Sequence, residues 1–182
     1  MSRMSFCSMV LVLALFIFTG CSSSTKSVTN ENLSLPTKKE DLPTYLRRFI
    51  PRGYPEKKFN IVLTPSDTVA DGYLINLDMR SDSITEERAL NIARDFIFAS
   101  FKASTINKLP IVYTSVNVNK ENGEKVLFVG VGSKVIEKIN IDTLKTGNME
   151  AYDFAKWMEA NRQQNEVDGK LLHDDCCVIN RF

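Results

Sequence analysis

SITEERALNIARDFIFASFKAS, residues 83–104, is the stretch of the chain that decides the fold. Small and apolar side chains recur in it at steps of three and four residues, the spacing that places them on one face of an α-helix. They are Ala89, Ile92, Ala93, Phe96 and Ser100. Thr85 is placed to cap the amino end, and Glu86 and Glu87 follow it where the helix dipole favours negative charge. We therefore predict an amphipathic helix whose apolar face lies on a sheet.

Two aromatic residues of this helix, Phe98 and Phe101, fall outside its apolar face. The carboxyl end of the helix is therefore apolar on more than one side. We expect a loop of the same chain to cover these rings, and a partner protein is the alternative.

The segments on either side of the helix are rich in β-branched and aromatic residues, which favours strands. Residues 59–64 and 72–79 flank a turn-rich segment and are expected to form a hairpin. Three further strand-like runs follow the helix, at 111–118, 125–131 and 134–141, separated by turn signals. Strands joined by short turns favour an antiparallel meander.

A second amphipathic helix is expected over residues 148–165, capped by Asn148. Its buried stripe comprises Ala151, Phe154, Ala155 and Met158. Trp157, the only tryptophan, lies at the edge of this stripe, and Tyr152 lies on the other flank. Aromatic side chains at such edges are enriched in binding hot spots, so both are candidates for partner contact. A half-buried core position is the alternative for Trp157.

These elements together predict an α+β fold. We expect an antiparallel sheet of about five strands, covered by two helices, in the chain order β-β-α-β-β-β-α.

The amino end carries an apolar run, Met9–Phe18, which is shorter than the roughly 20 residues that span a membrane. Arg3 precedes the run and the small pair Thr19-Gly20 follows it, which is the order of a secretory signal peptide. Cys21 comes next, ahead of a serine-rich stretch. The segment from residue 18 to residue 21 resembles the lipobox of bacterial lipoproteins, with Phe where that family usually has Leu.

The lipobox resemblance implies that the Cys21 thiol receives a diacylglyceryl group, that residues 1–20 are removed and that the new amino terminus is acylated, for example by palmitate. Several acyl chains hold a protein firmly on a membrane, because each buried CH₂ contributes about 0.8 kcal/mol. Ser22 stands where such proteins carry Asp when they stay in the inner membrane. We therefore expect an anchor on the periplasmic face of the outer membrane. A plain signal peptide or an uncleaved anchor is the alternative.

The chain after residue 20 divides into two parts by composition. Residues 21–40 are polar and have few large apolar side chains, so we expect a flexible tether. Residues 41–182 are expected to form a single α+β domain.

A second motif begins in the first helix. Thr85-Glu86-Glu87, Ala89 and Ile92-Ala93, followed by strands and by IDTLKTG at 141–147, resemble the PepSY module of secreted bacterial proteins over residues 83–147. The resemblance implies a module without catalytic residues of its own, which in some members binds or inhibits peptidases.

The tail GKLLHDDCCVINRF, residues 169–182, contains side chains that could carry other chemistry. His173, Asp174, Asp175, Cys176 and Cys177 are all potential metal ligands. Zinc sites usually space their thiolates two to four residues apart, and adjacent thiols point poorly at one ion, so we assign no metal. In an oxidising envelope Cys176 and Cys177 could instead form a vicinal disulfide, form a disulfide to another chain, or remain inert buried thiols.

Charge and motifs narrow the function. The chain has 23 basic and 22 acidic side chains, without the basic excess of a nucleic-acid-binding protein. It has one histidine and neither a nucleophile elbow nor a phosphate loop, so we assign no catalytic residue and no cofactor. We expect a non-enzymatic module that binds another envelope protein, as an accessory or assembly factor, an exclusion factor or a peptidase inhibitor. The alternative is an envelope hydrolase or a thiol-active protein that uses Cys176 and Cys177.

Overall fold

The structure, a computed structural model, describes residues 34–138 and 149–182 of the 182-residue chain. Cys21, the expected signal peptide and residues 21–33 of the expected tether lie outside the described residues. So do Asn148 and the segment 141–147. Among the residues that are described, no helix has both the length and the apolar character needed to span a membrane.

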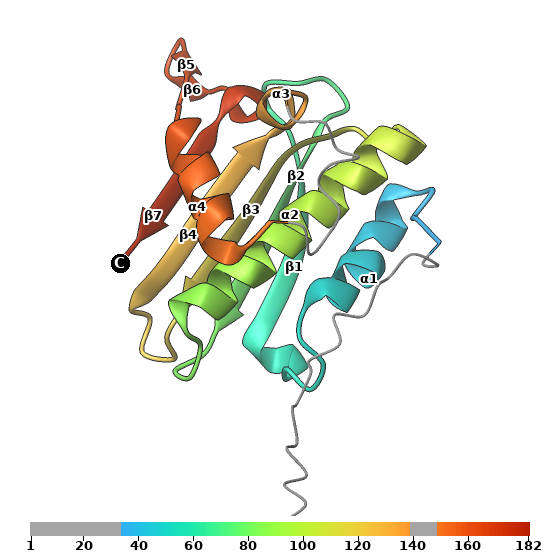
Figure 1. The fold of residues 1–182 in the computed structure, drawn as a ribbon. Helices are drawn as coiled ribbons and strands as arrows, with labels where there is room; N and C mark the ends of the chain where they lie inside the picture. Colours follow the sequence, from blue (N-terminus) through green and yellow to red (C-terminus); the bar gives the residue numbers. More distant parts are fainter. Residues whose placement is uncertain (1–33, 139–148) are drawn as a thin grey trace, which may run out of the picture.

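A five-stranded sheet forms the centre of the molecule, in the order β1-β2-β3-β4-β7 (Figure 1). The strands are β1 (Phe59–Pro65), β2 (Tyr73–Arg80), β3 (Ile111–Asn119), β4 (Lys125–Gly132) and β7 (Cys177–Arg181). The predicted α+β class and the predicted number of strands are therefore confirmed. The sheet is mixed, however, because β2 and β3 pair in parallel while the other three pairs are antiparallel.

The parallel pair is explained by the helix between its strands, α2 (Glu86–Asn107). Its 22 residues span about 33 Å, enough to carry the chain back along the sheet to the end where β2 began. The next strand then runs in the same direction as β2. The prediction of an antiparallel sheet is therefore wrong for this pair of strands. Helix α2 packs on the sheet and also forms the crossover connection between its two parallel strands.

Helix α2 begins where the sequence predicts. Thr85 is its N-cap, and the Thr85 hydroxyl accepts a hydrogen bond from the Arg88 backbone N–H at 3.3 Å. The predicted apolar face is buried, with Ala89, Ala93 and Phe96 fully removed from solvent. The helix ends at Asn107, and the next residue, Lys108, is its C-cap and adopts a left-handed backbone conformation with φ of 53°.

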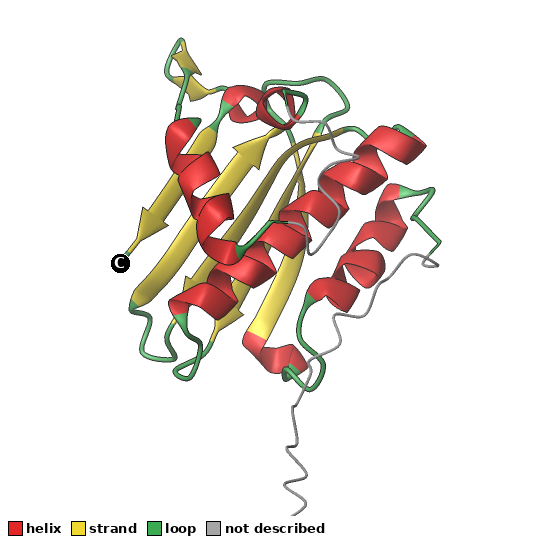
Figure 2. Ribbon diagram, in the orientation of Figure 1, coloured by secondary structure: helices red, strands yellow, loops and turns green. Residues whose placement is uncertain are grey.

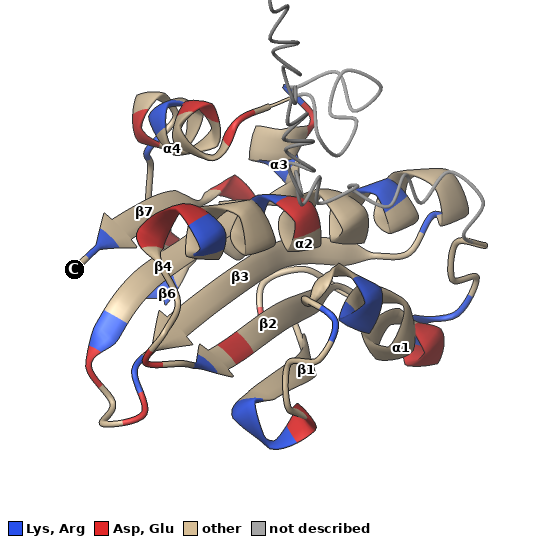
Figure 3. Ribbon diagram, turned by 60° about the horizontal axis from the view of Figure 1, so that its bottom comes forward, with Lys and Arg blue, Asp and Glu red and all other residues tan. Residues whose placement is uncertain are grey.

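The helices α1 (Leu42–Leu46), α2 and α4 (Ala151–Ala160) lie on the same face of the sheet (Figure 2). In the turned view of Figure 3, α2 and α4 lie above the strands. Helix α4 buries the predicted stripe of Ala151, Phe154, Ala155 and Met158. It is shorter than the predicted 148–165: its N-cap is Glu150 in place of Asn148, and it ends at Ala160, because Gln163 pairs with Cys177 instead of continuing the helix. One face of the sheet thus carries the core, and within residues 34–138 and 149–182 no helix of this length covers the opposite face.

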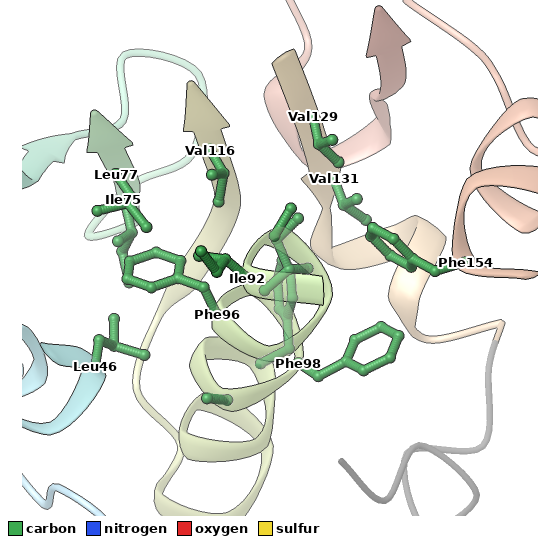
Figure 4. Packing of buried hydrophobic residues seen from close by; sticks show 14 of the residues in the cluster. Leu46, Ile75, Leu77, Ile92, Phe96, Phe98, Val116, Val129, Val131 and Phe154 are labelled. Atoms are coloured by element: carbon green, nitrogen blue, oxygen red, sulfur yellow. The ribbon is translucent and has the colours of Figure 1, made fainter. Parts of the chain in front are cut away.

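The contact between α2 and α4 accounts for the aromatic ring of Phe98. Phe96 and Phe98 leave α2 in different directions, Phe96 toward the sheet and Phe98 toward Phe154 (Figure 4). The rings of Phe98 and Phe154 meet edge to face, with centroids 5.6 Å apart. Phe98 is therefore covered by helix α4 of the same chain, and not by a loop as expected. Phe101 is buried in the same core.

The prediction of a strand at 134–141 is wrong where the structure describes it. Residues Ser133–Ile136 form a short helix, α3, and residues 139–141 lie outside the described residues. Val135 and Ile136 are both buried, which suits a helical turn and does not suit the alternation of a half-buried strand. The fifth strand is β7 from the tail, which pairs antiparallel with β4.

The remaining elements are short. They are a hairpin of β5 (Glu166–Val167) and β6 (Lys170–Leu171), and the 3₁₀ turns η1 (Lys39–Asp41), η2 (Arg47–Phe49), η3 (Glu56–Lys58) and η5 (His173–Asp175). Part of the expected tether, residues 34–40, is described and lies against the domain. Leu35 packs against the core, and the Asn107 side-chain amide donates a 2.6 Å hydrogen bond to the Pro36 carbonyl.

Candidate binding groove on the outer sheet face

The sheet face turned away from α2 and α4, called the outer face from here on, is polar over the carboxyl-terminal halves of β2 and β3. Successive side chains of a strand point to opposite faces. From Asn76 onward, the residues of β2 that alternate with the buried ones point outward, and in the parallel register each lies beside a polar residue of β3. The pairs are Asn76 with Ser115, Asp78 with Asn117, and Arg80 with Asn119.

Hydrogen bonds join these side chains into a network. The Ser115 hydroxyl donates to Asn76 Oδ1 at 2.8 Å, and Asn76 Nδ2 donates to Asp78 Oδ2 at 2.6 Å. Asn117 Nδ2 donates to the other carboxylate oxygen of Asp78, Oδ1, at 3.1 Å. Both oxygens of this carboxylate are thus hydrogen-bonded by amides, and the network fixes the orientation of the polar floor.

A groove of about 470 Å³ lies over this floor, where β1 begins and where β2 and β3 end. Its lining combines three basic residues (Lys57, Lys58 and Arg80), three amides (Asn60, Asn117 and Asn119), Phe59 and Asp78. Such a lining offers hydrogen-bond donors and positive charge around one carboxylate, which suits a polar ligand that carries negative charge.

Only part of this positive charge is neutralised by neighbouring acids. Lys58 Nζ lies 2.6 Å from the Glu121 carboxylate, and this hydrogen-bonded pair raises the pKa of Lys58. Among the described residues, no ion pair involves Lys57 or Arg80. Figure 3 shows the basic residues in blue just before β1 and the acidic residue of β2 in red.

The adjacent cysteines of the tail lie on opposite faces of the sheet, and both are free thiols. Cys177 belongs to the main core and its thiol donates to the Met158 carbonyl at 3.6 Å. Cys176 belongs to a small apolar cluster with Val112 and Tyr113. Burial raises the pKa of Cys176 to about 11 and that of Cys177 to about 12. Both thiols are therefore protonated at neutral pH, which is the unreactive form.

Of the neighbouring polar residues of the tail, Asp174 and Asp175 have polar partners, whereas the buried Nδ1 of His173 has no hydrogen-bond partner among the described residues. The His173 ring packs against the Tyr113 ring, with centroids 5.3 Å apart. Asp174 pairs with Lys134 at 2.9 Å, and the Asp175 carboxylate accepts hydrogen bonds from Gln163 at 2.7 Å and Asn165 at 2.8 Å. Within residues 34–138 and 149–182, no three His, Cys, Asp or Glu side chains are grouped so that they could hold a metal ion.

The two aromatic candidates for partner contact lie on α4, away from the groove. Tyr152 is 50% exposed. Trp157 is partly buried and stacks on Phe154, with ring centroids 6.4 Å apart and planes 19° apart. Trp157 therefore packs at the edge of the core, and only Tyr152 projects freely into solvent.

The groove residues were not among the candidates taken from the sequence. Their signal is the alternation of Asn76, Asp78 and Arg80 with buried residues in β2, and of Asn117 and Asn119 in β3. That signal becomes a site only when β2 and β3 are known to be parallel neighbours, because the register then places the polar residues side by side.

Comparison with known proteins adds no family to this description. No family model, curated protein or solved structure matches the chain. The structure itself identifies the chain as an α+β protein with an open, mixed five-stranded sheet.

Proposed function

We propose that the protein is a lipid-anchored bacterial envelope protein that acts as a non-enzymatic binding module. It holds another envelope protein against the outer face of its sheet, in the role of an accessory or assembly factor, an exclusion factor or a peptidase inhibitor. The observation that carries the proposal is the groove over β1, β2 and β3, on the face that α2 and α4 leave open. Its floor is a pre-organised hydrogen-bonding network, which is a property of binding surfaces.

The anchor in this proposal is the lipid on Cys21. The residues between Cys21 and Ser34 could extend over at most about 45 Å, from the reach of an extended chain. A domain held at that distance from a membrane meets partners that are themselves in the envelope, at a raised effective concentration. The proposed address is the periplasmic face of the outer membrane.

The thiols support a binding module better than a thiol-active protein. A nucleophilic or redox-active cysteine needs a lowered pKa and access to solvent. Cys176 and Cys177 have raised pKa values, are buried, and point into different apolar clusters. These properties suit thiols that fill space in the core.

Site-specific photo-crosslinking in living cells tests the proposal. A photoreactive amino acid replaces Asn119, which lines the groove, or Lys102, which is exposed on α2 over the other face. We expect Asn119 to crosslink to a discrete envelope protein and Lys102 to give no such product. Equal products from both positions, or none from Asn119, would contradict binding at the outer face.

A further inference from the structure

We propose that the segment bound in the groove is an acidic, extended stretch of the partner protein, which adds to the sheet as a strand beside β1. This inference rests on the proposed function, and it specifies the chemistry of the partner at that same surface. Its acidic side chain would lie between Lys57 and Arg80.

The edge of the sheet at β1 is open to such an addition. Strand β1 pairs with β2 on one side, and within the described part of the chain no strand pairs with its other side. The seven residues Phe59–Pro65 include no charged side chain. An uncharged edge strand with unpaired main-chain groups is a template for β-strand addition, in which main-chain hydrogen bonds supply affinity.

The open edge and the groove form one continuous surface. Asn60 of β1 lines the groove, and Val62, two residues further along the same strand face, is 38% exposed. Strands in a sheet lie about 4.8 Å apart, so an added strand would lie about 10 Å from β2. An outward-pointing glutamate on the added strand could then reach over β1 toward the long side chain of Arg80.

The charges of the groove favour a negatively charged side chain on the added strand. Asp78 is the only acidic residue in the lining, and both of its oxygens are already hydrogen-bonded by Asn76 and Asn117. Lys58 is paired with Glu121. Lys57 and Arg80 are the positive charges of the lining that no described residue neutralises. A carboxylate between them gains charge-assisted hydrogen bonds, whereas a lysine at the same place is repelled.

A peptide fits these observations better than an acidic glycan. Both could bring a carboxylate to Lys57 and Arg80. A glycan has no main-chain amides to pair with the open edge of β1, and it would leave Val62 without an apolar neighbour. The edge therefore favours a peptide.

The test is a binding titration with the full-length protein in detergent micelles. The probes are a short peptide of alternating valine and glutamate, the matched valine and lysine peptide, and an oligomer of galacturonic acid as the acidic glycan. We expect only the valine and glutamate peptide to bind, with an affinity that falls as salt concentration rises. Amide hydrogen exchange should slow in β1 when the peptide binds.

Variants with reversed charge locate the contact. We expect Arg80→Glu to weaken binding of the acidic peptide about tenfold or more. Lys102→Glu makes the same charge change on α2, over the other face, and is expected to leave the affinity unchanged. Circular dichroism checks that both variants keep the fold.

Three results would overturn the inference: tighter binding of the glycan than of the peptide, peptide binding without slower exchange in β1, or equal affinities for Arg80→Glu and the wild type. Each can occur while Asn119 still crosslinks to an envelope protein, in which case the proposed function stands and only the nature of the bound segment is wrong. Loss of the Asn119 crosslink itself would count against both.

Discussion

Cys176 and Cys177 are neighbours in the sequence, yet their thiols lie in different apolar clusters. Strand geometry explains the separation, because successive side chains in and around β7 point to opposite faces of the sheet. Cys177 contacts Met158 of α4, and Cys176 contacts the cluster around Tyr113. For each thiol the apolar surroundings disfavour the charged thiolate, which is the main cause of the raised pKa values.

We predict that these thiols make the folded protein less stable in alkaline solution. An unfolded cysteine loses its proton near a pKa of about 8.5. The folded-state pKa values are about 11 for Cys176 and about 12 for Cys177. Between these limits the unfolded state releases protons that the folded state keeps, so the stabilisation present at neutral pH is lost as pH rises through this range.

Urea denaturation at a series of pH values, from neutral pH to about pH 11, measures how the free energy of unfolding changes with pH. This series covers the range between the pKa of an unfolded cysteine and the pKa values of the folded thiols. The free energy of unfolding should decrease less steeply for Cys176→Ala/Cys177→Ala than for the wild type, whatever the difference between them at neutral pH. If the free energy of unfolding decreases equally with pH in the variant and the wild type, the two thiols have the same pKa values in the folded and unfolded states, and the prediction is wrong.

Side-chain burial on α2 and α4 could be predicted from the sequence, whereas the fate of the cysteines could not. The stripe of Phe154 and Met158 follows from helical spacing alone. The positions of Cys176 and Cys177 depend on the tail forming a strand beside β4, a pairing that no local pattern specifies.

At the scale of elements, an aromatic contact outside the main apolar face of α2 joins this helix to α4. Phe98 is 4% exposed, and its ring meets Phe154 edge to face. Trp157 stacks on the same Phe154 ring. Phe98 of α2 is therefore joined to α4 through Phe154 and Trp157.

We predict that Phe98→Ala lowers the free energy of unfolding by about 3–5 kcal/mol, the usual cost of removing a buried aromatic ring. Ile106→Ala is the control, because Ile106 lies on the same helix and is 54% exposed. Its effect should stay within about 0.5 kcal/mol.

Denaturant unfolding followed by Trp157 fluorescence measures both variants. Trp157 is the only tryptophan and stacks on the ring that Phe98 contacts, so its emission reports the loss of α4 packing. If Phe98→Ala costs no more than the control, α4 does not depend on this contact.

Elements with one clear periodicity could be predicted from the sequence, and those set by long-range pairing could not. Strands β1 to β4 and helix α2 appear where the patterns place them, and α4 keeps the predicted buried stripe within shorter bounds. The parallel pairing of β2 and β3 arises from the return path of α2. The helical turn at Ser133–Ile136 differs from the local pattern, because β-branched residues favour strands and yet Val135 and Ile136 are both buried in a helical turn.

At the scale of the whole molecule, the site depends on the order of the strands. The groove gathers residues from η3, β1, β2 and β3, which become neighbours only in the folded sheet. The class of fold could therefore be predicted from the sequence, whereas the groove had to be read from the structure, because it depends on which strands become neighbours.

The anchor is a prediction about the whole molecule, since it sets where the domain works. We expect Cys21→Ser to abolish incorporation of radioactive palmitate and either to release the protein from membranes or to block cleavage of residues 1–20. Cys176→Ser is the matched control, because that thiol is buried in the folded domain and should leave labelling unchanged. Palmitate incorporation into Cys21→Ser at the wild-type level would contradict the lipobox interpretation.

The position of β7 at the far edge of the sheet has a consequence for the order of folding. The β1–β2 and β3–β4 hairpins pair residues that are close in the sequence, as Pro65 and Tyr73 or Asn119 and Lys125 are. Strand β7 instead pairs Arg181 with Leu127, across a stretch that includes α3, α4 and the small hairpin. Such distant pairing is slow to form, because a long loop must close before any contact is gained. During synthesis the edge of β4 has no partner strand until β7 emerges, so the sheet is completed only after synthesis of residue 181.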